Sequence, residues 1–210
     1  CALPISCSKN NERNSFHKML IDKNEIKKIL IIKLKGIGDV VLSTIVLENI
    51  KSNFPNAQID FLTEKPSKDF LSLIPLINNV ITQLKKSFID DVKLIAQIRS
   101  NNYDLVLDFY SNPRTAIITF LSGAKYRAGF PFRFRKFAYN LLSQANPPIM
   151  HAAKLHLEFL KFIGIKAKSE NLHFGISEKD ISFAKDFFIK NFDENDFVIG
   201  VIPGGGWQSK

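Results

Sequence analysis

An aspartate follows two closely spaced glycines in the segment Lys35-Gly-Ile-Gly-Asp39. Because glycine has no side chain, a substrate hydroxyl can approach the backbone closely at Gly36 and Gly38. A carboxylate beside such an approach can accept the proton of that hydroxyl and act as a general base. Aspartate is also favoured at the start of a helix, where it caps N–H groups and complements the helix dipole. Asp39 is therefore the first candidate for catalysis, and helix capping is the structural alternative.

The same two glycines suggest a dinucleotide-binding turn, which would make the protein an NAD-dependent dehydrogenase. That turn needs a third small residue at position 41, where this chain has the bulky Val41. Asp39 would also place negative charge where the helix N-terminus should receive a pyrophosphate. Both residues disfavour phosphate binding at this turn, and the dehydrogenase remains the alternative enzyme.

A second polar segment, Asp108-Phe-Tyr-Ser-Asn-Pro-Arg114, ends an apolar run and precedes a predicted helix. Asn112 can donate and accept hydrogen bonds, and the guanidinium of Arg114 suits a phosphate or a carboxylate. If the strands are parallel, both residues lie at the same sheet edge as Asp39. The structural alternative is a capped turn with a solvated arginine.

The last residues of the chain, Gly204-Gly-Gly206 followed by Lys210, form a third candidate site. Their backbone N–H groups and one ammonium could hold a phosphate, although the spacing of a P-loop is absent. His151 and His156 are five residues apart and do not share a helix face, so the sequence predicts no metal site.

Basic and aromatic residues alternate between Lys125 and Phe137, with no acidic residue among them. The basic members are Lys125, Arg127, Arg133, Arg135 and Lys136, and the aromatic members are Tyr126, Phe130, Phe132, Phe134 and Phe137. Such a segment can engage an anionic membrane surface, a phosphorylated glycolipid or a nucleic-acid strand. A solvated rim over core phenylalanines is the structural alternative. A basic nucleic-acid-binding module is a further alternative function, but no helix-turn-helix or RNA-binding signature supports it.

Apolar runs of strand length alternate with segments of helical periodicity, which predicts an α/β fold. The predicted strands are Ile29–Leu34, Ile59–Leu62, Val80–Leu84, Leu105–Phe109, Tyr126–Gly129 and Phe197–Ile202. The predicted helices are Asp39–Phe54, Ser67–Leu73, Ile89–Arg99, Pro113–Ser122, Ala152–Ile163 and Glu178–Asn191. One further short helix is predicted at Lys136–Leu142, in an otherwise irregular stretch. This alternation implies right-handed βαβ units, and thus a Rossmann-like parallel sheet with helices on both faces. A regulatory receiver-like domain would share this fold, because fold does not determine function.

Length and composition favour a soluble globular protein with more than one domain. The chain has 210 residues, of which 45% are apolar and 23% charged, and its net charge of +9 favours phosphate-bearing or membrane-surface partners. Residues 1–18 lack the features of a secretory signal and are predicted to be a leader or a remnant of the expressed sequence. Residues 19–192 are predicted to form a first, Rossmann-like domain, and residues 193–210 the first strand and glycine loop of a truncated second domain. Both cysteines lie in the leader, which favours a cytoplasmic location. Charged residues interrupt the most apolar stretch, which excludes a membrane span there.

Five segments in order resemble glycosyltransferase family 9, the ADP-heptose:lipopolysaccharide heptosyltransferases. They are Ile29–Thr44, Phe54–Leu62, Tyr103–Arg114, Leu121–Phe130 and Val201–Lys210, and the resemblance extends from Lys28 to Lys210. It implies a GT-B architecture, in which two Rossmann-like domains face a cleft and the first domain holds the acceptor. This chain would contain that N-terminal domain.

The resemblance also assigns roles to residues. Asp39 matches the proposed base of an inverting, metal-independent transfer, Gly205, Gly206 and Lys210 match the contacts to the donor phosphates, and Gly36, Gly38, Asn112 and Arg114 lie on the acceptor side. The implied partners are an ADP-heptose-like donor and a phosphorylated glycolipid acceptor, with peripheral contact to the inner membrane surface, no cofactor and no nucleic acid. Family members continue beyond the matched lysine with a whole donor domain, so the fragment by itself is expected to be inactive.

Overall fold

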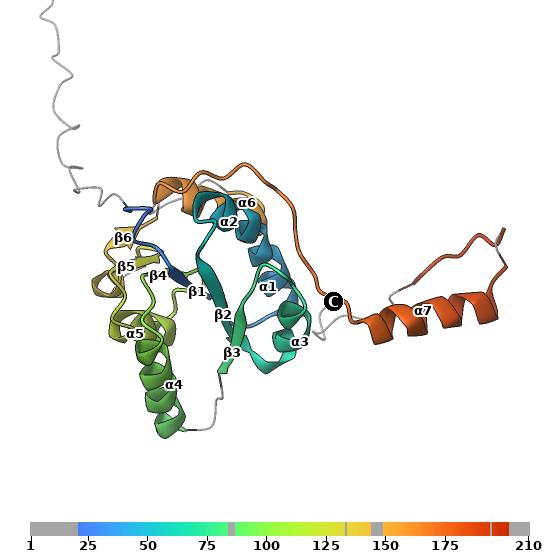
Figure 1. Cartoon of the computed structure of the whole chain (residues 1–210), viewed down its shortest axis with the longest axis horizontal. Helices are drawn as coiled ribbons and strands as arrows, with labels where there is room; N and C mark the ends of the chain where they lie inside the picture. The colour runs from blue at the N-terminus through green and yellow to red at the C-terminus, as the bar shows by residue number, and fades with distance from the viewer. Residues whose placement is uncertain (1–20, 84–86, 133, 144–148, 194, 202–210) are drawn as a thin grey trace, which may run out of the picture. The chain divides into compact units, whose positions relative to one another are not determined.

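The computed structural model describes residues 21–83, 87–132, 134–143, 149–193 and 195–201 (Figure 1). The chain divides into two compact units, Cys1–Gly175 and Ile176–Lys210, which we describe separately. The predicted domain boundary between residues 192 and 193 lies within the second unit.

The first unit is built on one sheet of six parallel strands. The strands are β1 (Lys28–Ile32), β2 (Gln58–Glu64), β3 (Asn79–Gln83), β4 (Leu105–Asp108), β5 (Tyr126–Gly129) and β6 (Leu141–Leu142), in the spatial order β3-β2-β1-β4-β5-β6. This is a Rossmann-like order, and it confirms the predicted parallel sheet. The order reverses between β1 and β4, whose last residues Ile32 and Asp108 are in register. In open parallel sheets, ligands bind beyond the carboxyl ends of the strands at such a point.

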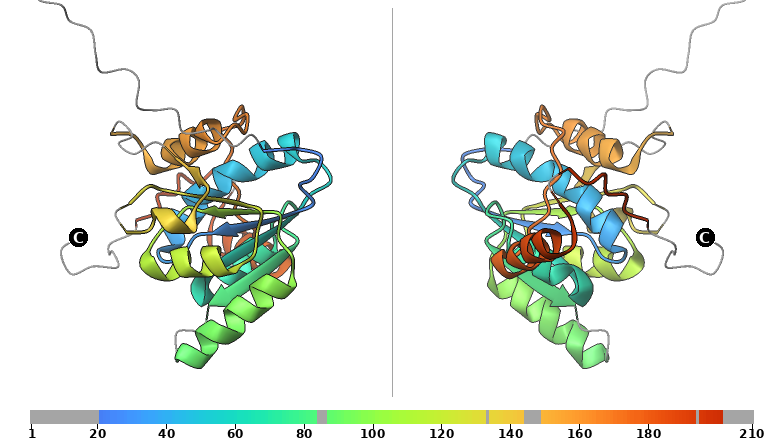
Figure 2. Two further views of the ribbon diagram at one scale, coloured as in Figure 1. Left: turned by 90° about the vertical axis from the view of Figure 1, so that its left-hand side faces the viewer. Right: turned by 90° about the vertical axis from the view of Figure 1, so that its right-hand side faces the viewer.

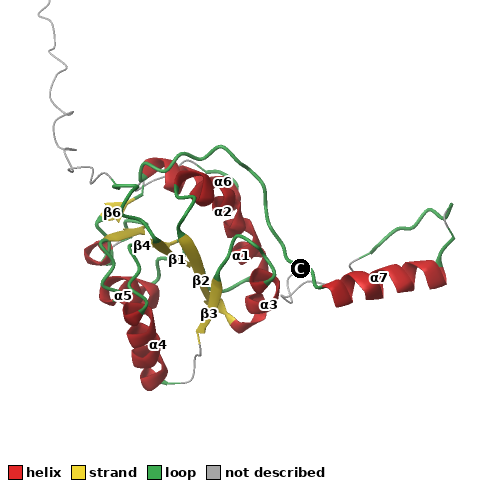
Figure 3. Ribbon diagram, in the orientation of Figure 1, coloured by secondary structure: helices red, strands yellow, loops and turns green. Residues whose placement is uncertain are grey.

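Helices cover both faces of the sheet, as predicted (Figures 2 and 3). One face carries α1 (Ile37–Ser43), α2 (Leu47–Asn53), α3 (Lys68–Ser72) and α6 (Ala152–Phe162), and the other carries α4 (Phe88–Ser100) and α5 (Pro113–Leu121). Side chains of β1 alternate between the two cores: Ile29 and Ile31 join the first, and Leu30 and Ile32 join the second. All four are fully buried, as expected for a central strand covered on both sides.

The predicted helix from Asp39 to Phe54 forms as two helices with a 3-10 turn, η1 (Thr44–Val46), between them. The hydroxyl of Ser43 donates to the carbonyl oxygen of Val40 (2.6 Å), and that of Thr44 donates to Val41 (2.7 Å). Such bonds from serine and threonine to the preceding turn compete with the backbone ladder and bend helices. They explain why the segment is interrupted at this point.

The predicted short helix at Lys136–Leu142 is wrong. The structure has a single 3-10 turn, η3 (Lys136–Ala138), followed by β6, which extends the sheet beside β5. The side chain of Asn140 leads into this pairing, because it accepts from the N–H of Arg127 (2.7 Å) and donates to the carbonyl of Lys125 (2.7 Å). Contacts with β5, which local periodicity does not report, therefore decide the conformation of this segment.

The second unit contains α7 (Glu178–Asn191), as predicted, and Ser177 caps it by accepting from the N–H of Asp180 (3.1 Å). The predicted strand Phe197–Ile202 is not found in its described part, Phe197–Val201. A strand needs ladder hydrogen bonds to a neighbour, and within the described residues this segment has none. Across the described ranges, no helix has both the length and the apolar character required to cross a bilayer.

Candidate active site

Asp39 lies at the carboxyl edge of the sheet, in the first turn of α1. The chain reverses direction after β1 because Lys35 (φ 55°) and Gly36 (φ 72°) both adopt left-handed conformations. Gly36 is the N-cap of α1, and its carbonyl accepts from the N–H of Val40 (3.0 Å). The Asp39 side chain is exposed, and its carboxylate forms no hydrogen bond with the described residues. The carboxylate therefore remains available to a ligand.

The two glycines before Asp39 differ in what a side chain would meet. A Cβ on Gly36 would lie 2.9 Å from Oδ2 of Asp39 and would have to tolerate a positive φ, whereas a Cβ on Gly38 would meet nothing within 4 Å. We expect Gly36→Ala to lower the free energy of unfolding by about 1 to 2 kcal/mol and to displace the carboxylate. Gly38→Ala is expected to stay within about 0.5 kcal/mol of the wild type. Urea unfolding of the two variants checks this, and equal stability losses would contradict it.

Lys33 adds a positive charge beside Asp39, and no sequence motif assigned a role in the site to this residue. It follows β1 directly, is half-buried, and holds its Nζ 5.9 Å from the ring centre of Tyr110. Burial lowers the pKa of Lys33, while the charges of Asp39 and Asp108 oppose that shift. The sequence signal for this role was a lysine directly after an apolar strand. A lysine that is partly buried at such a position needs negative charges nearby to offset the cost of burial.

Asn112 lies at the end of the loop after β4, next to the turn that carries Asp39, because β1 and β4 are neighbours. Its Oδ1 accepts from the N–H of Thr115 (2.7 Å), and Oγ1 of Thr115 accepts from the N–H of Asn112 (3.0 Å), which completes a capping box. With Pro113 at the first helical position, this cap starts α5 at the predicted residue. The carboxamide nitrogen of Asn112 has no hydrogen bond to the described residues and remains available.

Arg114 is paired within the fold. Its Nε donates to both carboxylate oxygens of Asp91 on α4 (2.9 and 3.1 Å), and its Nη2 donates to one of them. The two side chains are 31% and 27% exposed. The structure therefore brings Asn112 to the candidate site with a carboxamide N–H that can donate to a ligand. The guanidinium of Arg114, in contrast, is already bound by the carboxylate of Asp91.

Asp108 organises the loop between β4 and Asn112, a role that sequence reasoning missed. It is fully buried and accepts from the N–H of Ser111 (2.7 Å), the N–H of Tyr110 (3.0 Å) and the hydroxyl of Tyr139 (2.8 Å). Burial raises the pKa of Asp108, and these hydrogen bonds oppose the rise. Ser111 has φ 47°, so the Asp108 contacts hold a left-handed residue in the loop.

His156 on α6 is buried beneath the site at 3% exposure and packs edge-on against Phe109, with ring centres 4.9 Å apart. Burial, with the charge of Lys33 adding to it, lowers the pKa of His156 to about 3. An unfolded chain binds this proton near pH 6.5, and the native chain binds it only near pH 3. Acid therefore favours the unfolded state, and we expect His156 to lower the free energy of unfolding by about 1.4 kcal/mol per pH unit between pH 6 and 4.

Urea unfolding from pH 7 to 4.5 measures this dependence. His156→Leu is expected to reduce the slope by that amount, and His151→Gln, which changes the exposed histidine at the N-cap of α6, is the control. Equal slopes for wild type and His156→Leu would contradict the assignment.

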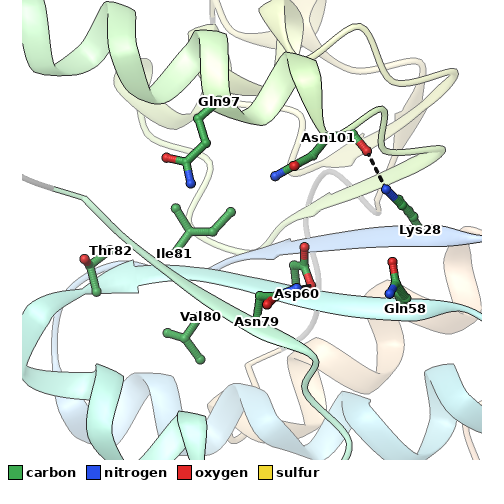
Figure 4. Close-up of a pocket in the computed structure, with 9 residues that line it drawn as sticks. All are labelled: Lys28, Gln58, Asp60, Asn79, Val80, Ile81, Thr82, Gln97 and Asn101. Atoms are coloured by element: carbon green, nitrogen blue, oxygen red, sulfur yellow. Dashed lines mark hydrogen bonds between the residues drawn. The ribbon is translucent and has the colours of Figure 1, made fainter.

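A pocket of about 480 Å³ lies elsewhere, beside the first residues of β1, β2 and β3 (Figure 4). Its lining is mostly polar and includes Lys28, Gln58, Asn79 and Asn101, with Nζ of Lys28 donating to the carbonyl of Asn101 (3.2 Å). None of the residues predicted to act in catalysis or binding lines it. The pocket is therefore separate from the candidate residues at the carboxyl edge of the sheet.

The predicted donor-phosphate residues Gly205, Gly206 and Lys210 lie outside the described residues. Among those that are described, no three His, Cys, Asp or Glu side chains gather as a metal site would require.

Comparison with known proteins places these residues in a family context. The model of glycosyltransferase family 9 (heptosyltransferase) matches residues 92–210. Lipopolysaccharide heptosyltransferase 1 of Campylobacter coli is 28% identical over 170 residues, which are 77% of this chain and 46% of that protein. The chain spans about half the length of the curated relatives it matches.

Two solved structures share the fold. The glycosyl transferase family 9 structure from Veillonella parvula has a TM-score of 0.71 at 21% identity. The superposition includes 84% of this chain and 54% of the Veillonella parvula chain. Escherichia coli heptosyltransferase WaaC with ADP has a TM-score of 0.59 at 18% identity. That superposition includes 69% of this chain and 50% of the WaaC chain.

Proposed function

Because this chain belongs to glycosyltransferase family 9, we propose that it forms the acceptor-binding domain of an enzyme that transfers a heptose, or a related sugar, from an ADP-sugar to the lipopolysaccharide core. The fold is the Rossmann-like N-terminal domain of a GT-B glycosyltransferase. Relatives are named lipopolysaccharide heptosyltransferases, and one related structure carries ADP. One observation supports the site more than any other: the carboxylate of Asp39, which is exposed and has no hydrogen bond to the described residues, lies at the point where the strand order reverses.

Asp39 acts as the general base in the proposed reaction. A hydroxyl of the acceptor sugar attacks the anomeric carbon of the donor while Asp39 takes the hydroxyl proton. The bond between that carbon and the phosphate oxygen breaks, ADP leaves, and the configuration at the carbon inverts. The turn at Gly36 and Gly38 leaves room for the acceptor, since a Cβ on Gly38 would enter open space.

The remaining candidate residues bind either the acceptor or the donor. Asn112 donates its free carboxamide N–H to the acceptor. Arg114 releases the carboxylate of Asp91 and binds a phosphate or carboxylate of the acceptor in its place. Gly205, Gly206 and Lys210 hold the leaving diphosphate through backbone N–H groups and one ammonium, so that the reaction proceeds without a metal. The acceptor is a phosphorylated glycolipid, which places the enzyme at the cytoplasmic face of the inner membrane.

The natural full-length polypeptide tests this proposal. We expect release of ADP and formation of a heptose-extended product when the protein is mixed with ADP-heptose and heptose-free lipopolysaccharide core, and no product with UDP-glucose. A protein that transfers no ADP-sugar, but quenches NADH fluorescence at micromolar concentration, would be a dehydrogenase instead.

A further inference from the structure

The positive charge of the chain is concentrated in one segment. From Phe109 to Leu157 the sequence has no aspartate or glutamate but seven lysines and arginines, in a chain whose net charge is +9. The described part of this segment forms α5, β5, η3 and β6, at the end of the sheet that is farthest from β3, and the first residues of α6. Arg114 and Lys125 pair with Asp91 and Glu25. Arg127, Arg135 and Lys136 have no carboxylate partner within the described residues, and they give this end of the sheet an excess of positive charge.

Large aromatic side chains are exposed on this side. Phe120 on α5 is 47% exposed, Phe137 on η3 is 59% exposed, and Phe132 in the loop after β5 is 47% exposed. The rings of Phe120 and Phe137 are in edge contact, with centres 5.5 Å apart. Tyr126 and Phe130, also from the aromatic segment, are buried instead. The structure therefore separates the core rings from a group of surface rings that the sequence could not distinguish.

Phe134 is the most exposed of these rings, at 90%, and its backbone is left-handed with φ 61°. A bulky residue in this conformation is an outlier, and backbone strain of this kind clusters at functional positions. Water exposure of the ring adds a second unfavourable term. Neither is offset by a contact within the described residues, so the conformation is consistent with a partner that covers the ring.

Two cations accompany the exposed rings. Arg135 holds its guanidinium 5.0 Å from the ring centre of Phe132 and donates to the carbonyl of Ser111, next to Asn112. Lys136 is exposed and makes no side-chain contact with the described residues. Phe120, Phe132, Phe134, Phe137, Arg135 and Lys136 are together called the basic aromatic surface. Through Ser111 this surface is joined directly to the candidate acceptor loop.

We propose that the basic aromatic surface docks the domain on an anionic lipid bilayer, with Phe134 inserted at the level of the headgroups. Apolar rings combined with cations are the combination that binds the interface of anionic membranes. The choice of a bilayer as the partner rests on the proposed function, because a glycolipid acceptor is embedded in one. Docking there places the Asn112 loop, and Asp39 beside it, toward the headgroup from which the acceptor sugar extends.

A single-stranded nucleic acid fits this surface less well. Such a strand binds by stacking its bases on free aromatic faces. Here the guanidinium of Arg135 lies over the ring of Phe132, and Phe120 and Phe137 pack against each other, so that among the four rings only Phe134 has no ring or cation contact with the described residues. A bilayer needs only apolar area and positive charge, without a free ring face.

Vesicle binding by the natural full-length protein tests the proposal. The vesicles contain phosphatidylglycerol and phosphatidylethanolamine, and vesicles of phosphatidylcholine serve as the neutral reference. We expect sedimentation with the anionic vesicles only, weakened by salt. The variant Phe134→Ser/Lys136→Gln removes no described side-chain contact and is expected to bind the anionic vesicles at least about tenfold more weakly.

The matched control is Phe88→Ser/Lys93→Gln on α4. It also removes one exposed ring (82%) and one exposed lysine, but beside the carboxylates of Asp90 and Asp91, and it is expected to bind like the wild type. Equal binding by the Phe134/Lys136 variant and the wild type would overturn the proposal. So would binding to a labelled oligonucleotide that is lost in the same variant, because the surface would then serve nucleic acid.

Transfer to a deacylated, soluble acceptor separates this proposal from the proposed function. The Phe134/Lys136 variant is expected to keep wild-type turnover on that acceptor while losing turnover on vesicle-bound acceptor. If the wild type binds anionic vesicles but transfers no sugar to the soluble acceptor, the proposed function fails and the docking surface stands.

Discussion

Replacing Asp39 with asparagine is expected to lower kcat for sugar transfer by about a hundredfold to ten-thousandfold. Asparagine has nearly the same shape but cannot take the proton of the acceptor hydroxyl. Since the Asp39 carboxylate is exposed and unpaired within the described structure, its loss should leave the free energy of unfolding within about 0.5 kcal/mol of the wild type. Steady-state release of ADP by the natural full-length protein, together with urea unfolding, measures both quantities.

Asp69 provides a matched control for this substitution. It too is an exposed aspartate in the first turn of a helix, α3, which follows the carboxyl end of the neighbouring strand β2. Asp69→Asn removes the same charge from an equivalent helix position and is expected to leave kcat unchanged. If Asp39→Asn retains wild-type turnover, Asp39 is only a helix-terminal charge and the base must lie elsewhere.

Asp108→Ala is expected to lower the free energy of unfolding by about 3 kcal/mol or more. The change leaves the N–H groups of Tyr110 and Ser111 and the buried hydroxyl of Tyr139 without their acceptor, and each unpaired buried group costs about 1 to 3 kcal/mol. It also releases Ser111 from its left-handed conformation and with it the carbonyl that binds Arg135. Urea unfolding measures the loss, and reduced protection of the 109–112 amides in hydrogen exchange reports the loop.

Asp104→Ala is the corresponding control at a more exposed position. Its carboxylate accepts from the N–H groups of Lys27 and Lys28 (both 2.8 Å) at a half-exposed site. Water can replace this acceptor, so a loss of about 1 kcal/mol is expected. A loss for Asp108→Ala no larger than that for Asp104→Ala would show that burial adds nothing to the role of Asp108.

Local patterns were sufficient to predict most of the elements. Apolar runs of strand length, separated by segments of helical periodicity, predicted five of the strands and the parallel sheet, because both patterns depend on residues that are close in the chain. Pro113 and Gly123 mark the ends of α5 as predicted, since φ near −65° and a positive φ are preferences of the residues themselves. The Gly-Ile-Gly-Asp39 turn was also found this way, because its glycines and its carboxylate are adjacent in the chain.

The interactions that build the site were not predictable from such patterns. Arg114 pairs with Asp91, which is 23 residues away, and Asp108 binds Tyr139, which is 31 residues away. β6 exists because β5 offers it an edge, and neither Leu141 nor its neighbours carry that information. Likewise, burial alone separates Phe130 in the core from Phe134 at the surface.

Sequence by itself therefore determined most of the strands and helices of the first unit, and which carboxylate follows the glycine turn. Only the tertiary structure decided which charges are paired, which rings face solvent, and which two loops meet at the edge of the sheet. The physical reason is that periodicity and capping act over a few residues, whereas ion pairing and burial depend on packing between segments that the chain brings together from far apart.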